Sequence, residues 1–332
     1  MGAFFDAATD FWALRAAALR ASRGVSRSAG CAAFLCELER EILQLQRELR
    51  EGRYEPGPFH TFPIRDPKPR VISAAPFRDR VVHHALCAAM EPVFEAEADF
   101  DSYACRTGKG TLAAVRRVQE HVRRWPWYAK LDVLHCFETA DLSLLGAMLA
   151  ARFDDPPLLA VLDRVLTRGA NAPGIGLPIG NLTSQHLANL LLGAVDREAR
   201  RLGVGGWVRY MDDLFVFGPD KATVKGQADA LAGFVSTHMG QTEKPSARRL
   251  APVSIGVPAL GFRVWPQRTR LDGPRRARFL RSMRGLGRAV RLGALAQGDA
   301  NRRVAAIVAW VAQGHSLGLR RTLLCCGWLA DR

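Results

Sequence analysis

The sequence contains few cysteines, and their spacing matches neither a disulfide framework nor a zinc site. Seven cysteines are scattered over 332 residues, without a Cys-x-x-Cys pair and without the histidine spacing that completes a zinc ligand set. This absence excludes a disulfide-stapled secreted module and a zinc finger. It predicts free, buried thiols in a reducing compartment.

Long apolar runs are also missing. No stretch approaches the ~20 apolar residues that a membrane-spanning helix needs. The opening segment MGAFFDAATDFWALRAAALR is rich in apolar residues, but Asp6, Asp10 and Arg15 interrupt it. It therefore lacks the apolar core of a signal peptide, and Asp6 also spoils the N-myristoylation pattern. We expect a soluble, cytoplasmic protein without membrane contact.

Acidic residues are scarce relative to basic ones. The chain has 47 Lys and Arg against 32 Asp and Glu, a formal net charge of +15. Such an excess is typical of proteins that bind polyanions, and nucleic acid is the first candidate. A basic surface that serves only solubility fits the charge equally well. The length allows one large domain or two ordinary ones.

Hydrophobic periodicity predicts helices separated by short strands. Apolar residues recur at three- and four-residue steps from Leu35 to Leu49, which indicates an amphipathic helix that ends near Gly52. The Pro-rich stretch that follows predicts extended pieces and a hairpin. Further helices are expected over 79–95, 109–124, 141–168 and 220–239.

The second half begins with a loop rich in Gly and Pro, GIGLPIG, at 174–180. It leads into an amphipathic helix, for which Asn181 and Thr183 are candidate N-caps. A β-hairpin is expected at GWVRYMDDLFVFG and a second one at GVPALGFRVWP. From Pro274 onward the chain is rich in Arg and has no Lys, so we expect a domain boundary near residue 272.

Two adjacent acids, Asp212 and Asp213, lie at the tip of the first hairpin, in the run RYMDDLFVFG. Asp-Asp is good turn chemistry, and in an isolated hairpin that explanation would suffice. Here, however, the neighbouring residues are aromatic or aliphatic. Burying two like charges costs several kcal/mol each unless something cancels them. A divalent cation would do so.

A third acid, Asp132, lies within the apolar run WYAKLDVLHCF, which predicts a strand. Three carboxylates on neighbouring strands can hold two Mg²⁺ ions about 3.5 to 4 Å apart, as in enzymes of phosphoryl and nucleotidyl transfer. Mg²⁺ suits such a site because it takes few carboxylates and leaves positions for phosphate oxygens. Asp141, on the same stretch, is better placed to cap the following helix.

These motifs resemble those of the reverse transcriptases. RYMDDLFVFG is similar to their Tyr-x-Asp-Asp hairpin, KLDVLHCF to their first aspartate strand, and GLPIGNLTSQHLANLLL to the loop and helix behind the templating base pair. RDPKPRVISAAPFRDRVVHHAL and DSYACRTGKGTLAAV resemble the fingers, and GVPALGFRVWP the primer grip. The resemblance covers roughly 33–266 in the family's order. It implies an α+β right-hand polymerase, with fingers, a palm built on an antiparallel sheet, and a helical thumb.

The resemblance also implies the residues of the site. Asp132, Asp212 and Asp213 would be catalytic and, with the carbonyl of Val133, would bind two Mg²⁺ ions. Phe137 would block a 2′-hydroxyl, so that deoxynucleotides (dNTPs) are the substrates. Lys68 and Arg70 would grip the triphosphate, which suits their charge, although a solvated basic turn explains them equally. The remaining substrate-binding residues would be Ile179, Gly180, Gln185, Tyr210 and Met211.

One departure from the common pattern points to a subtype. Most reverse transcriptases have Gln-Gly and Ser-Pro where this sequence has Ile179-Gly180 and Ser184-Gln185. The latter pattern resembles the reverse transcriptases of diversity-generating retroelements, whose copying of template RNA is error-prone at adenines. An aliphatic residue at 179 removes an amide donor from beside the new base pair. The alternatives are a retron-like or phage-defence reverse transcriptase and a non-catalytic RNA-binding scaffold.

The expected domains are an N-terminal helical extension (1–30), fingers with part of the palm (31–125), palm (126–271) and thumb (272–332). The family's Lys-Thr motif before the last hairpin is absent, so the proton donor to pyrophosphate is either Lys244 or Arg248. Expected partners are template RNA, the RNA:DNA hybrid and, by resemblance, a small basic helical accessory protein. The thumb arginines that would meet the hybrid are Arg275, Arg276, Arg278, Arg281, Arg284, Arg288 and Arg291.

Overall fold

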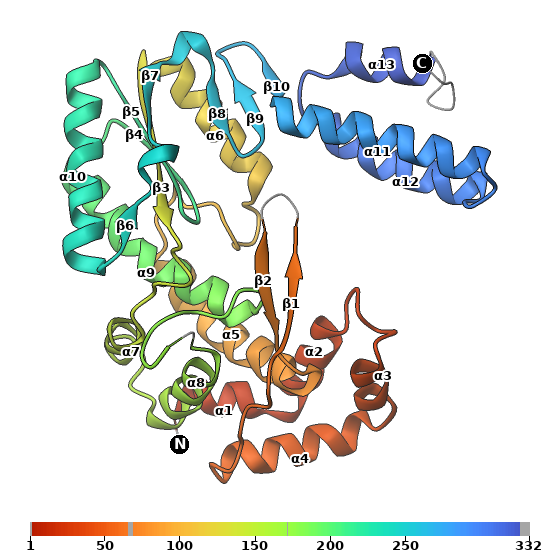
Figure 1. Cartoon of the computed structure of the whole chain (residues 1–332). Helices are drawn as coiled ribbons and strands as arrows, with labels where there is room; N and C mark the ends of the chain where they lie inside the picture. Colours follow the sequence, from red (N-terminus) through yellow and green to blue (C-terminus); the bar gives the residue numbers. More distant parts are fainter. Residues whose placement is uncertain (1, 66–68, 171, 326–332) are drawn as a thin grey trace.

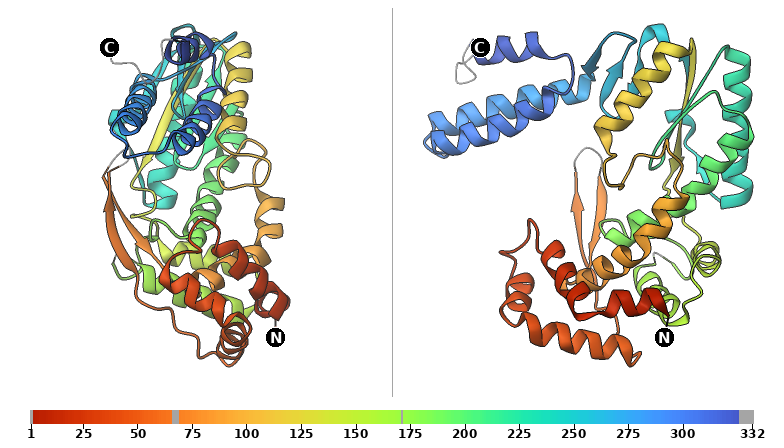
Figure 2. Two further views of the ribbon diagram at one scale, coloured as in Figure 1. Left: turned by 90° about the vertical axis from the view of Figure 1, so that its right-hand side faces the viewer. Right: turned by 180° about the vertical axis from the view of Figure 1, so that it is seen from behind.

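The computed structural model describes residues 2–65, 69–170 and 172–325. It is an elongated molecule with a helical base, a central antiparallel sheet and a helical arm at the opposite end from the base (Figure 1). Figure 2 shows the same three parts from the side and from behind. Helices of the base are α1 (Ala3–Thr9), α2 (Phe11–Ala21), α3 (Ala29–Cys36), α4 (Leu38–Arg50), α5 (Phe77–Glu97), α7 (Leu142–Ala150) and α8 (Pro156–Gly169).

The central sheet has the strand order β4-β5-β3-β6, and β7 pairs with β3 beside β6. All of these pairings are antiparallel. The strands are β3 (Trp127–Leu134), β4 (Gly206–Tyr210), β5 (Asp213–Gly218), β6 (Thr242–Glu243) and β7 (Arg249–Pro252). This is the antiparallel palm sheet that the sequence led us to expect.

Both faces of the palm sheet are covered, because side chains alternate along each strand. Leu131 and Leu214 point into a core formed with α9 (Leu182–Arg201) and α10 (Lys221–Met239). Tyr128 and Phe215 point into the core on the other face, formed with α6 (Thr111–Arg124) and the small sheet β8-β9-β10. The strands of the small sheet are β8 (Val257–Ala259), β9 (Phe262–Val264) and β10 (Thr269–Leu271).

Two helices expected from the sequence are each divided. The stretch 141–168 forms α7 and α8, because Asp155 caps a new helix through the Leu158 N–H and Pro156 occupies its first turn. The stretch that ends near Gly52 is likewise two helices, α3 and α4, which meet at the non-helical Glu37. Asp141 caps α7, as expected, by accepting hydrogen bonds from Ser143 N and Leu144 N.

The fingers hairpin consists of β1 (His60–Ile64) and β2 (Arg70–Ala74), which pair antiparallel. It rises from the base toward the open side of the palm (Figure 1). Arg70 is the first residue of β2. Lys68 lies outside the described residues.

The helical arm follows β10 and starts with Asp272. Asp272 caps α11 (Gly273–Arg291) by accepting from Arg275 N, and α12 (Gln297–Val311) and α13 (Leu317–Cys325) follow. Its small core contains Phe279, Met283 and Val311. The remaining arginines of the expected set are exposed along α11: Arg276, Arg278, Arg281, Arg284, Arg288 and Arg291.

Arg275 departs from that arrangement. Its guanidinium lies over the rings of Phe262 and Trp310, 6.0 and 5.1 Å from their centroids. This arginine is only half-exposed, and it joins the arm to the small sheet by cation–π contacts. Within the described ranges, no helix is long and apolar enough to span a bilayer.

Candidate active site

The three candidate carboxylates meet where β3 and β5 pair. Asp132 of β3 lies directly opposite Asp213 of β5, and Asp213 in turn pairs with Tyr210 of β4. The two residues between Tyr210 and Asp213 form the turn, so Asp212 stands at the hairpin tip beside them. Met211 has φ +52°, a conformation that non-glycine residues rarely adopt, as the tightness of this turn requires.

Backbone hydrogen bonds fix this end of the sheet. Val133 N donates to Asp212 O at 3.2 Å, which ties the hairpin tip to the strand that carries Asp132. Lys244 N donates to Asp132 O at 2.8 Å on the other side of β3. All three aspartates are half-buried. Their positions are thus set by main chain, and their side chains remain accessible.

The site concentrates negative charge. Burial, together with the carboxylates of Asp213 and Asp132, raises the pKa of Asp212 to about 6, while Arg70 acts in the opposite direction. One of the three charges is offset, because Lys130 Nζ lies 2.6 Å from Asp213 Oδ1. Lys130 and Asp132 are two residues apart on β3 and face the same side.

This donor set suits a hard divalent cation. Carboxylate oxygens are the ligands that Mg²⁺ prefers, and a raised carboxyl pKa marks a charge that a cation would compensate. Asp132 and Asp212 would bind it, whereas Asp213 is engaged by Lys130. Among the residues that the structure describes, no three acidic, His or Cys side chains are already grouped closely enough to hold a metal ion.

The comparisons with known proteins agree with this geometry. The model of the family "Reverse transcriptase (RNA-dependent DNA polymerase)" matches residues 63–241, more than half of the chain. The chain belongs to the reverse transcriptase family. Its expected right-hand polymerase fold, with fingers, palm and thumb, is thereby confirmed.

Several curated proteins are similar to this reverse transcriptase. Protein YkfC of Escherichia coli (strain K12) is 27% identical over 182 residues, 51% of this chain and 48% of that protein. The putative COX1/OXI3 intron 1 protein of Saccharomyces cerevisiae is 24% identical over 162 residues, 46% of this chain and 19% of that protein. Nuclear intron maturase 1 of Arabidopsis thaliana is 28% identical over 112 residues, 30% and 16% of the two chains. The chain thus spans less than half the length of these relatives.

Among solved structures, telomerase from Candida albicans in complex with a fragment of telomeric RNA aligns with a TM-score of 0.49 and 10% identity. The alignment covers 66% of this chain and 46% of the telomerase chain.

The expected substrate-binding residues are each held by contacts with a neighbouring element. Phe137 is half-buried against the core, five residues after Asp132. Ile179 contacts β2 through its carbonyl, which accepts from Ser73 N at 2.8 Å. Gln185 Oε1 accepts from Cys105 Sγ at 3.4 Å, and the Tyr210 hydroxyl accepts from Thr111 Oγ1 at 3.0 Å.

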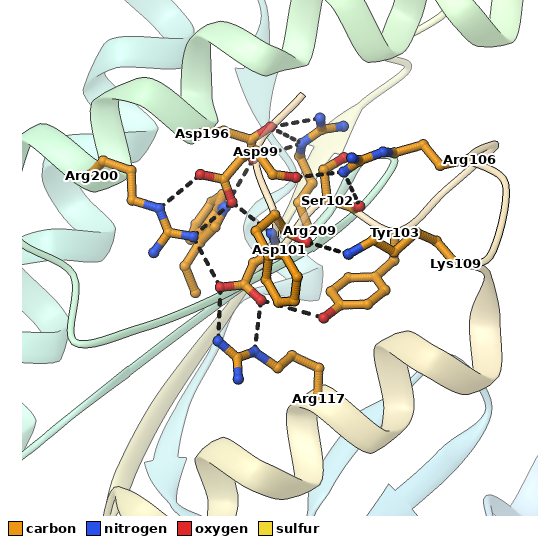
Figure 3. A network of polar contacts seen from close by, with 12 residues as sticks. Asp99, Asp101, Ser102, Tyr103, Arg106, Lys109, Arg117, Asp196, Arg200 and Arg209 are labelled. Carbon is orange, nitrogen blue, oxygen red and sulfur yellow. Dashed lines mark hydrogen bonds and ion pairs between the residues drawn. The ribbon is translucent and has the colours of Figure 1, made fainter. Parts of the chain in front are cut away.

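The hairpin that carries Asp212 and Asp213 is supported by a buried ionic network (Figure 3). Arg209, next to Tyr210, is 2% exposed, and its guanidinium binds both carboxylate oxygens of Asp196 at 2.7–2.9 Å. The segment before α6 lies along the edge of β4: Arg209 N donates to Asp101 O at 2.9 Å, and Tyr103 N donates to Arg209 O at 3.0 Å. The motif DSYACRTGKGT therefore acts as an additional edge for the hairpin.

Three functional contacts were missed from the sequence. Lys130 could have been found, because a basic residue two positions from Asp132 shares its face of the strand. The buried pair of Arg209 and Asp196 had no comparable signal, since no local pattern pairs a residue of α9 with one thirteen positions later on the following strand. Asn181, one of the two candidate caps, does occupy the N-cap position of α9, but its side chain makes no cap hydrogen bond to the helix.

Proposed function

We propose that this chain is an RNA-directed DNA polymerase that extends a primer 3′-hydroxyl with deoxynucleotides on a template RNA. The observation that carries the proposal is the register of Asp132 against Asp213, with Asp212 at the hairpin tip. Two Mg²⁺ ions bound there would activate the hydroxyl and neutralise charge on the leaving pyrophosphate. Asp132 and Asp212 would hold them, with the Val133 carbonyl assisting.

Further residues bind the deoxynucleotide. Arg70 begins β2 on the palm-facing hairpin and is close enough to Asp212 to lower its pKa against the effect of burial. A guanidinium there suits a triphosphate, and Lys68 would act with it. Phe137 would exclude a 2′-hydroxyl.

Lys244 is the better candidate for the proton donor to pyrophosphate. Its main chain is hydrogen-bonded to Asp132, and no carboxylate among the described residues pairs with its ammonium group. Arg248 is instead held by Glu243 at 3.0 Å and by Asp229 on α10. A guanidinium engaged by two carboxylates is poorly suited to deliver a proton.

The arm is the proposed track for the RNA:DNA hybrid. Exposed guanidinium groups along α11 match the sugar-phosphate backbone of an A-form-like duplex, which proteins read by shape. By family resemblance, a small basic helical accessory protein would deliver the template RNA.

We further propose that copying is error-prone at template adenines, as in diversity-generating retroelements. Support comes from Ile179, which is half-buried and is fixed to β2 through its carbonyl. Because its side chain is aliphatic, it offers no hydrogen bond to the new base pair. Ile179→Gln restores an amide at this position and should reduce errors at adenines. An unchanged error spectrum in this variant would count against the proposal.

One experiment tests the activity and the subtype together. The purified protein is given a defined primed RNA, Mg²⁺ and dNTPs, and its cDNA is sequenced, with Asp212→Asn as the blank. Products that require Asp212 and carry errors at template adenines support the mutagenic polymerase. Faithful products favour a retron-like or phage-defence enzyme. The absence of product, even with the accessory protein, favours a non-catalytic RNA-binding scaffold.

A further inference from the structure

The side chain of Asn181 connects two parts of the molecule that are far apart in sequence. Its Nδ2 donates to Ser73 O at 2.9 Å, and its Oδ1 accepts from Ala75 N at 3.3 Å. Ser73 lies near the end of β2, the strand that begins with Arg70, and Ala75 directly follows the strand. The amide group thus bonds to the edge of β2 as a neighbouring strand would.

The main chain beside Asn181 extends the same contact. Ile179 O accepts from Ser73 N at 2.8 Å, so Ser73 is bonded through both of its main-chain polar groups. Gly180, between Ile179 and Asn181, has φ +112°, and a Cβ on it would lie 2.7 Å from Ile72 Cγ2. Only glycine allows the loop to approach β2 this closely. Asn181 is 3% exposed, so water does not compete for its hydrogen bonds.

Asn181 also occupies the N-cap position of α9 without capping it. Asparagine is among the best N-cap residues, because its side-chain oxygen can accept a hydrogen bond from an N–H of the first helical turn. The amide group instead bonds to the fingers. Its position is therefore determined by β2, and the structure shows a use for this residue that the helix does not explain.

We infer that Asn181 is a positioning residue that fixes the fingers hairpin to the loop behind the templating base pair, and so fixes Arg70 for the incoming deoxynucleotide. Arg70 lies three residues before Ser73 on the same short strand. A shift of β2 at Ser73 is therefore transmitted to Arg70. This inference rests on the proposed polymerase function and adds a specific determinant of nucleotide binding to it.

The test uses Asn181→Asp, which keeps the shape and the acceptor for Ala75 N but removes the donor to Ser73 O. It leaves two oxygens facing each other in a buried position, which removes the attraction between the side chain and Ser73 O. The Kd of the next correct dNTP is measured on a primer that ends in a dideoxynucleotide, so that no chemistry is needed. We expect this Kd to rise about tenfold, which corresponds to ~1.4 kcal/mol, while the affinity for the primer–template alone is unchanged.

Hydrogen exchange at the Ser73 and Ala75 amides reports the contact itself, and it should be faster in Asn181→Asp. Gly180→Ala forces the loop away from β2 without altering the side-chain amide of Asn181, and it should reproduce both the higher dNTP Kd and the faster exchange.

Asn189→Asp is the matched control, because Asn189 lies two turns further along α9 and donates to Ala104 O at 2.7 Å, away from β2. Its exchange at Ser73 and Ala75 should equal that of the wild type.

Faster exchange with an unchanged dNTP Kd would overturn the inference, since the contact would then be structural only. Unchanged exchange in both variants would overturn it as well, because the fingers would not depend on this contact. Failure of the polymerase proposal gives a different result. In one case, the wild type would bind dNTP on the dideoxy-terminated complex but would not extend an ordinary primer. In the other case, it would bind no dNTP, while exchange at its Ser73 and Ala75 amides still depended on Asn181. The latter result would leave the contact without a role in nucleotide binding and would also overturn the inference.

Discussion

The Lys130 ammonium lies 2.6 Å from Asp213 Oδ1, on the same face of β3 as Asp132. Asp213 therefore has a carboxylate directly opposite it and a cation diagonally beside it. Cross-strand neighbours at these spacings interact. The palm thus offsets the charge of Asp213 with a lysine of its own sheet.

Replacing Lys130 by Met keeps the side-chain length and removes this cation. We expect a lower melting temperature in EDTA, because the carboxylates then repel one another more strongly. Mg²⁺ should raise the melting temperature of Lys130→Met more than that of the wild type, since a more negative site attracts the cation more strongly. Thermal unfolding with and without Mg²⁺ measures both effects.

Lys225→Met is the control for this prediction. Lys225 pairs with Asp229 at 2.7 Å on the surface of α10, and such exposed pairs contribute ~0–1 kcal/mol. Its melting temperature should change little, and Mg²⁺ should not distinguish it from the wild type. An equal response of the two lysine variants to Mg²⁺ would contradict the role assigned to Lys130.

Asp212 makes stability depend on pH. Burial, followed by Asp213 and Asp132, raises its pKa from 3.8 to about 6. The folded state therefore keeps the proton over a range in which the unfolded state has lost it. Ionisation of Asp212 costs stability progressively from about pH 4 to pH 6, and the whole cost applies above pH 6.

The variant Asp212→Asn removes this cost. In EDTA we expect it to melt at a higher temperature than the wild type at pH 8, with the difference shrinking as the pH falls from 6 toward 4. Mg²⁺ should stabilise the wild type at pH 8 and stabilise the variant less. A difference in melting temperature that is the same at pH 4 and pH 8 would show that the charge of Asp212 is not responsible.

The buried pair of Arg209 and Asp196 should be indispensable to the fold around the hairpin. Asp196→Asn leaves the guanidinium uncompensated at a site where both side chains are 2% exposed. Breaking such a pair costs about 3–5 kcal/mol, which urea unfolding would detect. Adding Arg209→Met should recover part of the loss, because the unpaired charge is then gone.

A surface pair on the same helix provides the comparison. Glu198 binds Arg201, whose side chain is 71% exposed. Glu198→Gln should therefore cost at most ~1 kcal/mol. If both single variants lose the same stability, the network in Figure 3 is not the support that its geometry indicates.

The sequence was most informative where a residue conflicts with its surroundings. Asp132, Asp212 and Asp213 stood out because acids are rare inside apolar strands, and the structure brings all three to one end of the palm sheet. Their catalytic role stays a prediction. The register that places Asp132 opposite Asp213 depends on pairing between distant segments, which no local pattern specifies.

Local rules failed where a tertiary contact competes with them. Asn181 has the position and the chemistry of a helix cap, but its amide group bonds to β2. Arg275 fits the spacing of the exposed arginines, but the rings of Phe262 and Trp310 lie within its reach. The break between α7 and α8 is a different case, because Asp155 followed by Pro156 was a visible helix start.

Lys244 and Arg248 can be separated as proton donors by their effect on the chemical step. Lys244→Gln removes the ammonium but keeps the main-chain hydrogen bond to Asp132 O. Since a general acid contributes about 10²–10⁴-fold, we expect the single-turnover rate of nucleotide incorporation to fall by that factor, with little change in dNTP affinity. Arg248→Gln breaks the ion pairs with Glu243 and Asp229, so it should lower stability and leave the rate near that of the wild type. A slower rate in Arg248→Gln than in Lys244→Gln would reverse the assignment, because the donor must be the residue whose loss slows incorporation once substrate is bound.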